Sequence, residues 1–154
     1  MLAVLSKEEI RSILERYKTI AVVGLSKNPT KDSHRVAKYM KTKGYRVVPI
    51  NPFADAILGE KCYNNLLDVA ETVEVVDIFR PAKEVLPIVD QAINLKKKIG
   101  NPSVVWMQLG IVNEEAAKRA RDAGLTVVMN KCIMAEHKRL SRGVVSSNQM
   151  KISK

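Results

Sequence analysis

Cysteine, histidine and aromatic residues are scarce in this chain of 154 residues. It has two cysteines, Cys62 and Cys132, and two histidines, with no Cys-x-x-Cys pair. This excludes the ligand spacing of a structural zinc site, and in a reducing compartment we expect two separate thiols. Aromatic residues make up 5% of the chain, which is few for a surface that stacks nucleic-acid bases. We therefore expect no metal site, and nucleic acid ranks last among the partners considered.

Long apolar runs and a secretion signal are also missing. No stretch is apolar for long enough to cross a bilayer, and the first residues lack the charged, apolar and small-residue order of a signal peptide. We expect a cytoplasmic protein with no membrane partner. The formal net charge of +10 attracts anions of any kind and does not identify one.

Helical and strand patterns alternate along the chain. The length suits one domain with one core, which we place at residues 1–140, followed by a basic, loosely ordered tail at 141–154. Strands are expected at 19–24, 45–50, 73–79, 103–107 and 125–129, with a short sixth at 61–63. Helices are expected from the Ser6 and Glu9 capping box to 17, at 32–43 and 66–70, after Pro81, between Asn113 and Gly124, and at 133–140. This alternation predicts an α/β protein with a three-layer Rossmann-like fold and a five- to six-stranded, mainly parallel sheet.

A parallel sheet of this kind binds ligands beyond the carboxyl ends of its strands, where the strand order reverses. With the common order 3-2-1-4-5, that crevice lies between the loop at 24–34 and the loop after the strand at 73–79. In the first loop, Gly24 permits close approach of a ligand, and the following helix N-terminus favours a phosphate. The motif is not a complete G-x-G-x-x-G, because positions 26 and 29 are Ser and Pro. A solvated polar loop is the alternative interpretation.

The end of the second strand argues against a classical NAD domain. Such domains place an acidic residue there to hold the ribose hydroxyls. This chain has Asn51 followed by Pro52. The position can still pack against an adenine, with Pro52 as an apolar surface.

Five ordered blocks of residues resemble the small stand-alone CoA-binding proteins, which are similar to the CoA-binding domain of the succinyl-CoA synthetase α subunit. The resemblance covers about 20–140. The blocks are Val22-Val23-Gly24-Leu25-Ser26 leading to Pro29-x-Lys31-x-Ser33, then 44–52, Asp77-Ile78-Phe79-Arg80-Pro81, Trp106-x-Gln108-x-Gly110, and Asn130-x-Cys132 with Glu136-His137.

The resemblance implies coenzyme A as the ligand and assigns places to its parts. The phosphates would lie among Gly24, Ser26, Lys31 and Ser33, with His34 in reach of a phosphate. Asn51 and Pro52 would border the adenosine; Phe79, Arg80, Pro81 and Val85 would line the opposite wall, and Gln108 would lie near the pantetheine path. For Phe79, a core position is the alternative.

We identify no catalytic group in the sequence. Succinyl-CoA synthetase works with a phosphohistidine in a second domain and with a partner subunit, and we expect no such domain in a sequence of this length. We therefore expect binding without turnover, as a CoA carrier, store or redox-linked sensor. Cys132 follows the last strand and precedes a helix, a position that favours a thiolate and a mixed disulfide with CoA. A small packing residue is the alternative.

Two other functions remain open at this stage. An NAD(P)-binding redox or oxidoreductase domain agrees with the fold, and a nucleic-acid binder agrees with the charge, although no recognition motif accompanies it. Free CoA and acyl-CoA are not distinguished by the sequence. A homo-oligomer or a protein partner also remains open.

Overall fold

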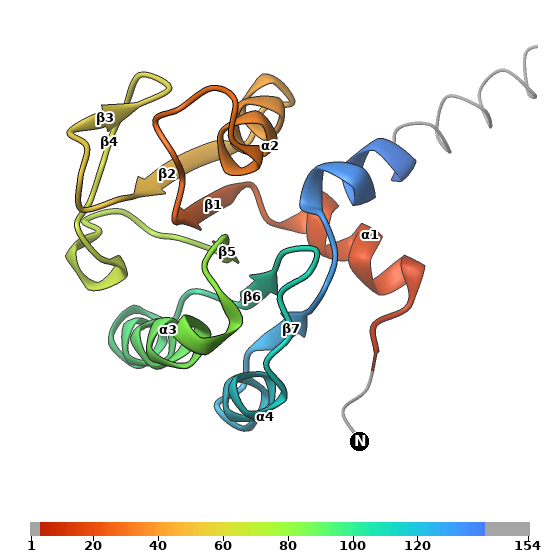
Figure 1. Ribbon diagram of the computed structural model, residues 1–154. Helices are drawn as coiled ribbons and strands as arrows, with labels where there is room; N and C mark the ends of the chain where they lie inside the picture. The colour runs from red at the N-terminus through yellow and green to blue at the C-terminus, as the bar shows by residue number, and fades with distance from the viewer. Residues whose placement is uncertain (1–3, 141–154) are drawn as a thin grey trace, which may run out of the picture.

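The computed structural model describes residues 4–140, and the tail expected at 141–154 lies outside the described residues. Helices and strands alternate along it (Figure 1). The strands are β1 (Thr19–Val23), β2 (Arg46–Ile50), β3 (Ala56–Ile57), β4 (Glu60–Lys61), β5 (Val75–Ile78), β6 (Val104–Met107) and β7 (Thr126–Val128). The helices are α1 (Lys7–Arg16), α2 (Asp32–Thr42), α3 (Val85–Ile99) and α4 (Glu114–Asp122), with 3₁₀ turns η1 (Leu66–Asp68) and η2 (Ala82–Glu84) and a last helix at 133–140.

The main sheet has five strands in the order β2-β1-β5-β6-β7. All neighbouring pairs are parallel, and β1 lies between β2 and β5, with Val22 in register with Pro49 on one side and Asp77 on the other. The chain builds outward from β1 in one direction and then in the other, so the order reverses between β1 and β5. The predicted α/β fold is confirmed. The order 3-2-1-4-5 expected from the sequence places a third strand beyond β2, whereas β2 is the edge strand of this sheet. The reversal of the order beside β1 is as expected.

Helices cover both faces of this sheet and give the fold three layers (Figure 1). Helices α3 and α4 pack on one face, here called the α3–α4 face, against inward side chains such as Val76 and Ile78. Helices α1, α2 and 133–140 pack on the other, the α1–α2 face, against Val75 and Trp106. Because side chains alternate along a strand, Asp77 points to the α1–α2 face.

Local sequence signals fix several helix ends. The Ser6 Oγ accepts a hydrogen bond from the Glu9 amide at 3.1 Å, and the Glu9 carboxylate accepts one from the Ser6 amide at 3.0 Å, which confirms the predicted capping box. Asn113 caps α4 by accepting from the Ala116 amide at 2.9 Å. Gly44 follows α2 with φ of +93°, a conformation that favours glycine.

The segment between β2 and β5 differs from the prediction. Residues 61–63 do not form one edge strand: β4 pairs with β3 in an antiparallel hairpin, while Tyr63 forms a single parallel bridge to Ile50. The helix expected at 66–70 is only the 3₁₀ turn η1. Pro81 precedes η2, and α3 begins four residues after it, at Val85. Short apolar segments such as these take their conformation from the contacts around them.

Within residues 4–140 no helix has the length and apolar character needed to span a membrane. The same residues contain no group of three or more His, Cys, Asp or Glu side chains placed to hold a metal ion. Cys62 and Cys132 are free thiols, and each is partly buried.

Candidate functional site

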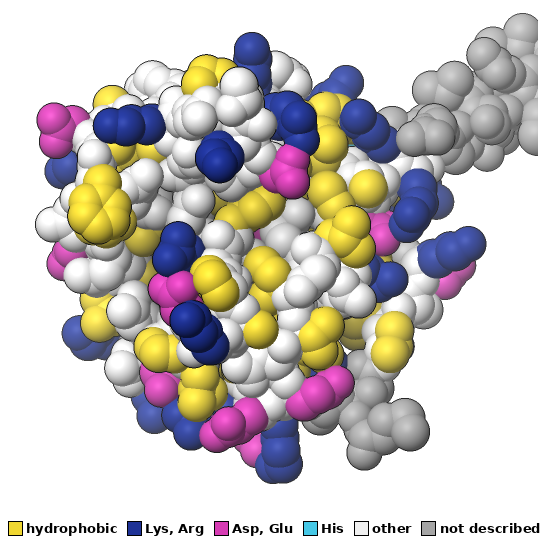
Figure 2. All heavy atoms as spheres, in the orientation of Figure 1, with side chains coloured by type: hydrophobic (Ala, Val, Ile, Leu, Met, Phe, Trp, Pro, Cys, Tyr) yellow, Lys and Arg dark blue, Asp and Glu magenta, His cyan; other side chains and the backbone are white. Residues whose placement is uncertain are grey.

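A cleft of about 480 Å³ opens at the carboxyl ends of β5 and β6. Its walls come from the start of α2, the segments after β5 and β6, and the start of the last helix. The lining residues are Asp32, Arg35, Val36, Phe79, Arg80, Pro81, Gln108, Leu109, Ile111, Cys132 and Met134. Figure 2 shows hydrophobic side chains across the middle of this side of the molecule, with Lys and Arg around them. A second cavity, of about 470 Å³, lies between α1 and the last helix, away from these strand ends.

Gly24 is the point where the loop after β1 meets the loop after β5. A Cβ atom at this position would lie 2.7 Å from the Phe79 carbonyl oxygen and 2.8 Å from the Arg80 Cδ, and the φ of Gly24 is +88°. Both distances are shorter than real Cβ contacts allow. Glycine is therefore required for the close approach of the two loops that border the crevice.

The loop at 24–34 has a fixed shape. The Ser26 amide donates to the Ser33 Oγ at 2.9 Å, the Ser26 Oγ accepts from the Asn28 amide at 3.1 Å, and the His34 Nδ1 lies 2.8 Å from the Ser26 carbonyl oxygen. Helix α2 begins after Lys31, and no side chain caps it. The amide groups of its first turn therefore lack a capping side chain, which is the usual condition for anion binding at a helix start.

Asn51 connects the loop after β2 to the loop after β1. Its Nδ2 donates to the Leu25 carbonyl oxygen at 2.9 Å, and its Oδ1 accepts from the Phe53 amide at 2.7 Å. The side chain is thus used within the protein and holds the turn that presents Pro52. The Phe53 ring, 87% exposed, lies beside it.

Two guanidinium groups line the cleft from different elements. Arg80 follows β5 and donates to both carboxylate oxygens of Glu84 at 3.0 Å, while Arg35 in α2 pairs with Asp32. Both arginines are exposed, and a guanidinium fork can bind a phosphate with two hydrogen bonds. The sequence prediction included Arg80 and missed Arg35, because the predicted segment ended at His34, one residue earlier.

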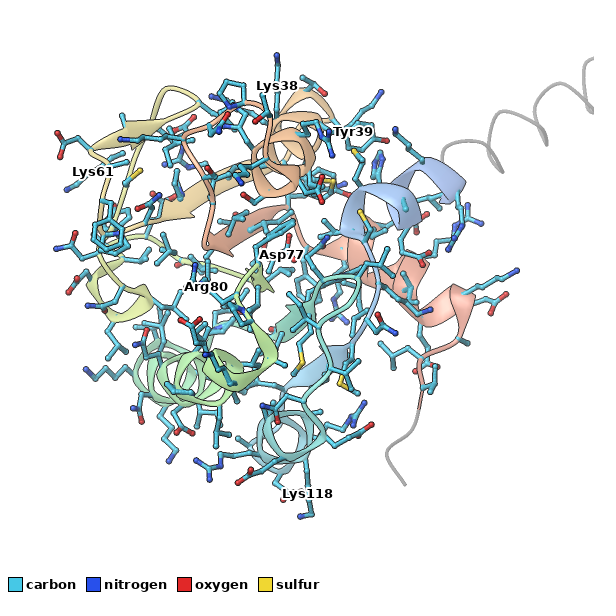
Figure 3. All side chains as sticks on the ribbon, viewed as in Figure 1. Lys38, Tyr39, Lys61, Asp77, Arg80 and Lys118 are labelled. Atoms are coloured by element: carbon cyan, nitrogen blue, oxygen red, sulfur yellow. The ribbon has the colours of Figure 1, made fainter. Side chains whose placement is uncertain are left out.

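The buried polar side chains of the described residues, Ser33, Asp77 and Gln108, all lie near the carboxyl ends of the strands. Gln108 is 4% exposed, and its Oε1 accepts from the Ile133 amide at 3.0 Å, which fixes the start of the last helix. Asp77, which is labelled in Figure 3, lies in β5. It is 1% exposed, and its Oδ1 has no hydrogen-bond partner. Burial raises the pKa of the Asp77 carboxyl well above its ordinary value. The prediction missed Asp77 as a site residue, although an acid inside an apolar strand was a signal.

Cys132 is placed in the cleft by a turn with two tertiary hydrogen bonds. The Trp106 Nε1 donates to the Lys131 carbonyl oxygen at 2.8 Å, and the Asn130 Oδ1 accepts from the Gly110 amide at 2.7 Å. Asn130 has a φ of +61°, which Asn tolerates better than most residues. Cys62 lies outside the cleft, and burial raises the pKa of its thiol.

The cleft brings together five of the predicted site residues, namely Phe79, Arg80, Pro81, Gln108 and Cys132. A further seven lie in the loops next to it or at the start of α2: Gly24, Ser26, Lys31, Ser33, His34, Asn51 and Pro52. Val85 is fully buried in the core of the α3–α4 face and does not line the cleft. Phe79 is partly buried and packs on the α1–α2 face while also lining the cleft.

Comparisons with known proteins identify relatives of similar length. The protein YneT of Bacillus subtilis, described as uncharacterized, is 38% identical over 132 residues, which is 86% of this chain and 94% of YneT. A hypothetical protein from Pyrococcus horikoshii has a solved structure with a TM-score of 0.83 and 46% identity, and the match covers 88% of this chain and 92% of that one.

A much longer relative matches part of this chain. An ADP-forming acetate–CoA ligase from Archaeoglobus fulgidus is 37% identical over 68 residues, which is 43% of this chain and 10% of the ligase. The family model described as a CoA binding domain matches residues 18–138. These residues include every strand of the sheet and every lining residue of the cleft. The chain therefore belongs to the CoA-binding domain family.

Proposed function

We propose that residues 1–140 form a single domain that binds coenzyme A or an acyl-CoA in the cleft, without catalysis of its own. The observation that carries this proposal is the family match over residues 18–138, combined with a cleft at the carboxyl ends of the strands beside the point where their order reverses. A role as a CoA carrier, store or redox-linked sensor would require no further domain.

The charge and polarity around the cleft support a specific orientation of the ligand. Arg35 and Arg80 line the cleft, and Lys31 lies directly before α2, whose first amides have no capping side chain. With Ser26 of the same loop, these groups would bind the phosphate end. The adenosine lies along the turn of Asn51 and Pro52. The pantetheine arm then runs past Gln108 toward Cys132.

The hydrogen bonds of the Asn51 side chain favour CoA over a dinucleotide as the ligand. An NAD domain needs a free acceptor at this position for the ribose hydroxyls. Here the side chain is an amide, and both its Nδ2 and its Oδ1 bind backbone groups of the protein. We therefore expect NAD to lack its usual ribose contact in this protein.

Isothermal titration with CoA, NAD and NADPH tests the proposal. We expect saturable binding of CoA and no comparable binding of either dinucleotide. Lys31→Ala should weaken CoA binding about tenfold, because a charge-assisted contact with phosphate is removed. Lys118→Ala is the matched control, since Lys118 lies on α4, pairs with Asp122 at 2.7 Å and is 70% exposed (Figure 3). The control should bind CoA as the wild type does. Heat from a dinucleotide with none from CoA would refute the proposal.

Cys132 is the group through which CoA binding becomes redox-linked. Its thiolate attacks one sulfur of CoA disulfide, the disulfide bond breaks, and one CoA leaves as a thiolate that takes up a proton. The product is a mixed disulfide between Cys132 and the other CoA, with no net oxidation of the system.

Mass spectrometry after incubation with CoA disulfide tests this step. We expect one CoA-sized adduct that reductant removes, present in Cys62→Ser and absent in Cys132→Ser. An adduct that disappears in Cys62→Ser instead, or no adduct at all, would exclude the proposed role of Cys132 and leave reversible CoA binding unaffected.

A further inference from the structure

The lining of the cleft changes in character from one end to the other. The charged side chains among its described lining residues are Asp32 and Arg35, at the start of α2, and Arg80, after β5. The segment after β6 and the start of the last helix contribute uncharged residues, namely Gln108, Leu109, Ile111, Cys132 and Met134. Because β6 lies on the side of β5 away from β1, the charged end of the cleft is near the reversal of the strand order, and the uncharged end is remote from it.

The uncharged end presents an apolar surface, here called the apolar end and formed by Leu109, Ile111 and Met134. Leu109 is 69% exposed, and the other two are partly buried. Two of the six large apolar side chains that are exposed within residues 4–140 lie in this one short segment, Leu109 and Val112. Single exposed apolar side chains are ordinary on a protein surface, whereas a group of them in a cleft is typical of a surface that part of a ligand covers.

Hydrogen bonds within the protein fix the shape of the apolar end. The Ile111 amide donates to the Gln108 carbonyl oxygen at 2.9 Å and closes a turn. The Gly110 amide, inside this turn, donates to the Asn130 Oδ1 at 2.7 Å. The Gln108 Oε1 accepts from the Ile133 amide at 3.0 Å, which ties the turn to the last helix. A ligand that covers a surface fixed in this way has little ordering to induce.

The proposed orientation of CoA brings its thiol to the apolar end. Arg35 and Arg80 lie at the phosphate end, and the pantetheine arm runs past Gln108 toward Cys132, which lines the cleft together with Met134. In free CoA the arm ends in a thiol, which covers little apolar surface. In an acyl-CoA the acyl chain continues from the same sulfur and removes apolar side chains from water.

We infer that the cleft selects an acyl-CoA whose acyl chain is apolar and uncharged, and that this chain packs against Leu109, Ile111 and Met134. This inference rests on the proposed function, because it assumes that CoA occupies the cleft with its thiol at the apolar end. Met134 has a flexible side chain that can adapt to chains of different length. An acyl chain that ends in a carboxylate has no cationic partner among the described lining residues at this end.

Isothermal titration with CoA, acetyl-CoA, butyryl-CoA, hexanoyl-CoA and succinyl-CoA tests this inference. Full burial of one methylene group strengthens binding about fourfold, and an open cleft buries it only in part. We therefore expect the affinity to rise about twofold to threefold with each methylene group from acetyl-CoA to hexanoyl-CoA. Succinyl-CoA has the chain length of butyryl-CoA and ends in a carboxylate, so it should bind about tenfold more weakly than butyryl-CoA.

Leu109→Ala tests the position of the acyl chain. This variant should lose about fivefold more affinity for hexanoyl-CoA than for CoA, because it removes apolar contacts that only the acyl chain makes. Leu67→Ala is the matched control, since Leu67 is 42% exposed, lies in η1 and does not line the cleft. The control should leave the ratio of the two affinities unchanged.

Methyl signals in ¹H–¹³C NMR spectra provide a second readout on the wild-type protein. Hexanoyl-CoA should shift the methyl signals of Leu109, Ile111 and Met134 further than CoA does. The methyl signals of Leu67 should stay in place with both ligands. Equal shifts of the three cleft residues with CoA and with hexanoyl-CoA would contradict the inference.

The outcomes separate this inference from the proposed function. Equal affinities for CoA, butyryl-CoA and hexanoyl-CoA, or succinyl-CoA bound as tightly as butyryl-CoA, would overturn the selection of an apolar acyl chain and leave CoA binding established. A preference for hexanoyl-CoA that Leu109→Ala does not reduce would overturn the assigned position of the chain. Absence of binding by all five ligands would overturn the proposed function itself.

Discussion

The two faces of the sheet differ in what they bury. The core of the α3–α4 face consists of apolar side chains, and the small residues Ala116, Ala117 and Ala120 bring α4 close to the sheet. The α1–α2 face buries Trp106 and Tyr45 together with the polar Ser33, Asp77 and Gln108. The cleft opens on this second face.

This difference separates stability from ligand binding within one small domain. Removal of apolar groups from the α3–α4 face should reduce the stability of the fold and leave the affinity for CoA unchanged. Truncation of side chains that line the cleft should alter affinity and affect stability less. The two leucine variants below test this separation directly, and the other variants test individual contacts.

The largest expected effect on stability is that of Leu95→Ala. Leu95 lies in α3, is 5% exposed and packs in the core of the α3–α4 face. Removal of a buried Leu side chain should lower the free energy of unfolding by about 2–5 kcal/mol. Urea denaturation measures this loss, and titration should give an unchanged CoA affinity for the folded protein.

Leu109→Ala is the matched control for Leu95→Ala. Leu109 is 69% exposed and lines the cleft. Its truncation should change stability by less than about 0.5 kcal/mol and should weaken CoA binding. If both leucine variants changed stability and affinity together, the two faces would not be separate in function.

Gly24→Ala should have the next largest effect. A Cβ at this position meets the Phe79 carbonyl oxygen at 2.7 Å, whereas a Cβ at Gly44 meets nothing within 4 Å. Both glycines have positive φ, +88° and +93°, so Gly44→Ala should cost about 1–2 kcal/mol of stability from the backbone alone. Gly24→Ala should cost about 1–3 kcal/mol more and should also weaken CoA binding. Equal losses in the two variants would show that the contact with Phe79 has no consequence.

Asp77→Asn should increase stability at neutral pH, by about 1–3 kcal/mol at most. The raised pKa of Asp77 means that the folded chain keeps a proton that the unfolded chain releases. Stability of the wild type therefore falls as the pH rises above about 3.9. Denaturation at pH 3.5 and pH 7.5 should show a gain for the variant at the higher pH and a smaller difference at the lower one. A gain of the same size at both values would mean that ionisation of Asp77 is not involved.

The smallest effect concerns His137 in the last helix. Its Nδ1 lies 2.8 Å from the Tyr39 hydroxyl. The pKa of the imidazole is lowered, mainly by burial and to a smaller extent by the positive charges of Lys43 and Lys18. The unfolded chain thus takes up a proton more readily as the pH falls below about 6.5, and the folded state loses stability. His137→Phe keeps a ring and removes this titration. From pH 7 to pH 5, the free energy of unfolding of the wild type should fall relative to that of His137→Phe. A constant difference between the two proteins would contradict this account.

The sequence predicted the main sheet and its helices well, because their signals are local. The Ser6 and Glu9 capping box, the Asn113 cap and the glycine after α2 each act within a few residues. The segment around Tyr63 was predicted less well. Its conformation depends on pairing with Ile50 across the chain, which no local pattern specifies.

The site was predictable where residues follow strand ends, as Phe79, Arg80, Gln108 and Cys132 do. The site was not predictable where a side chain enters the cleft from a helix or lies inside the packed fold. Arg35 reaches the cleft from the fourth position of α2, and the sequence does not show which face of the helix meets the crevice. The burial of Asp77 and the missing partner of its Oδ1 depend on the elements packed against the sheet, which only the folded structure shows.

Mapping of CoA binding onto the backbone amides by ¹H–¹⁵N NMR titration tests the central claim most directly. We predict shifts concentrated in the loop at 24–34, the segment at 79–81 and the turns that hold Gln108 and Cys132. The loops at the amino ends of the strands, which contain Gly44, Gly100 and Gly124, should keep their signals. Shifts centred on the cavity between α1 and the last helix, or no shifts at saturating CoA, would contradict the account.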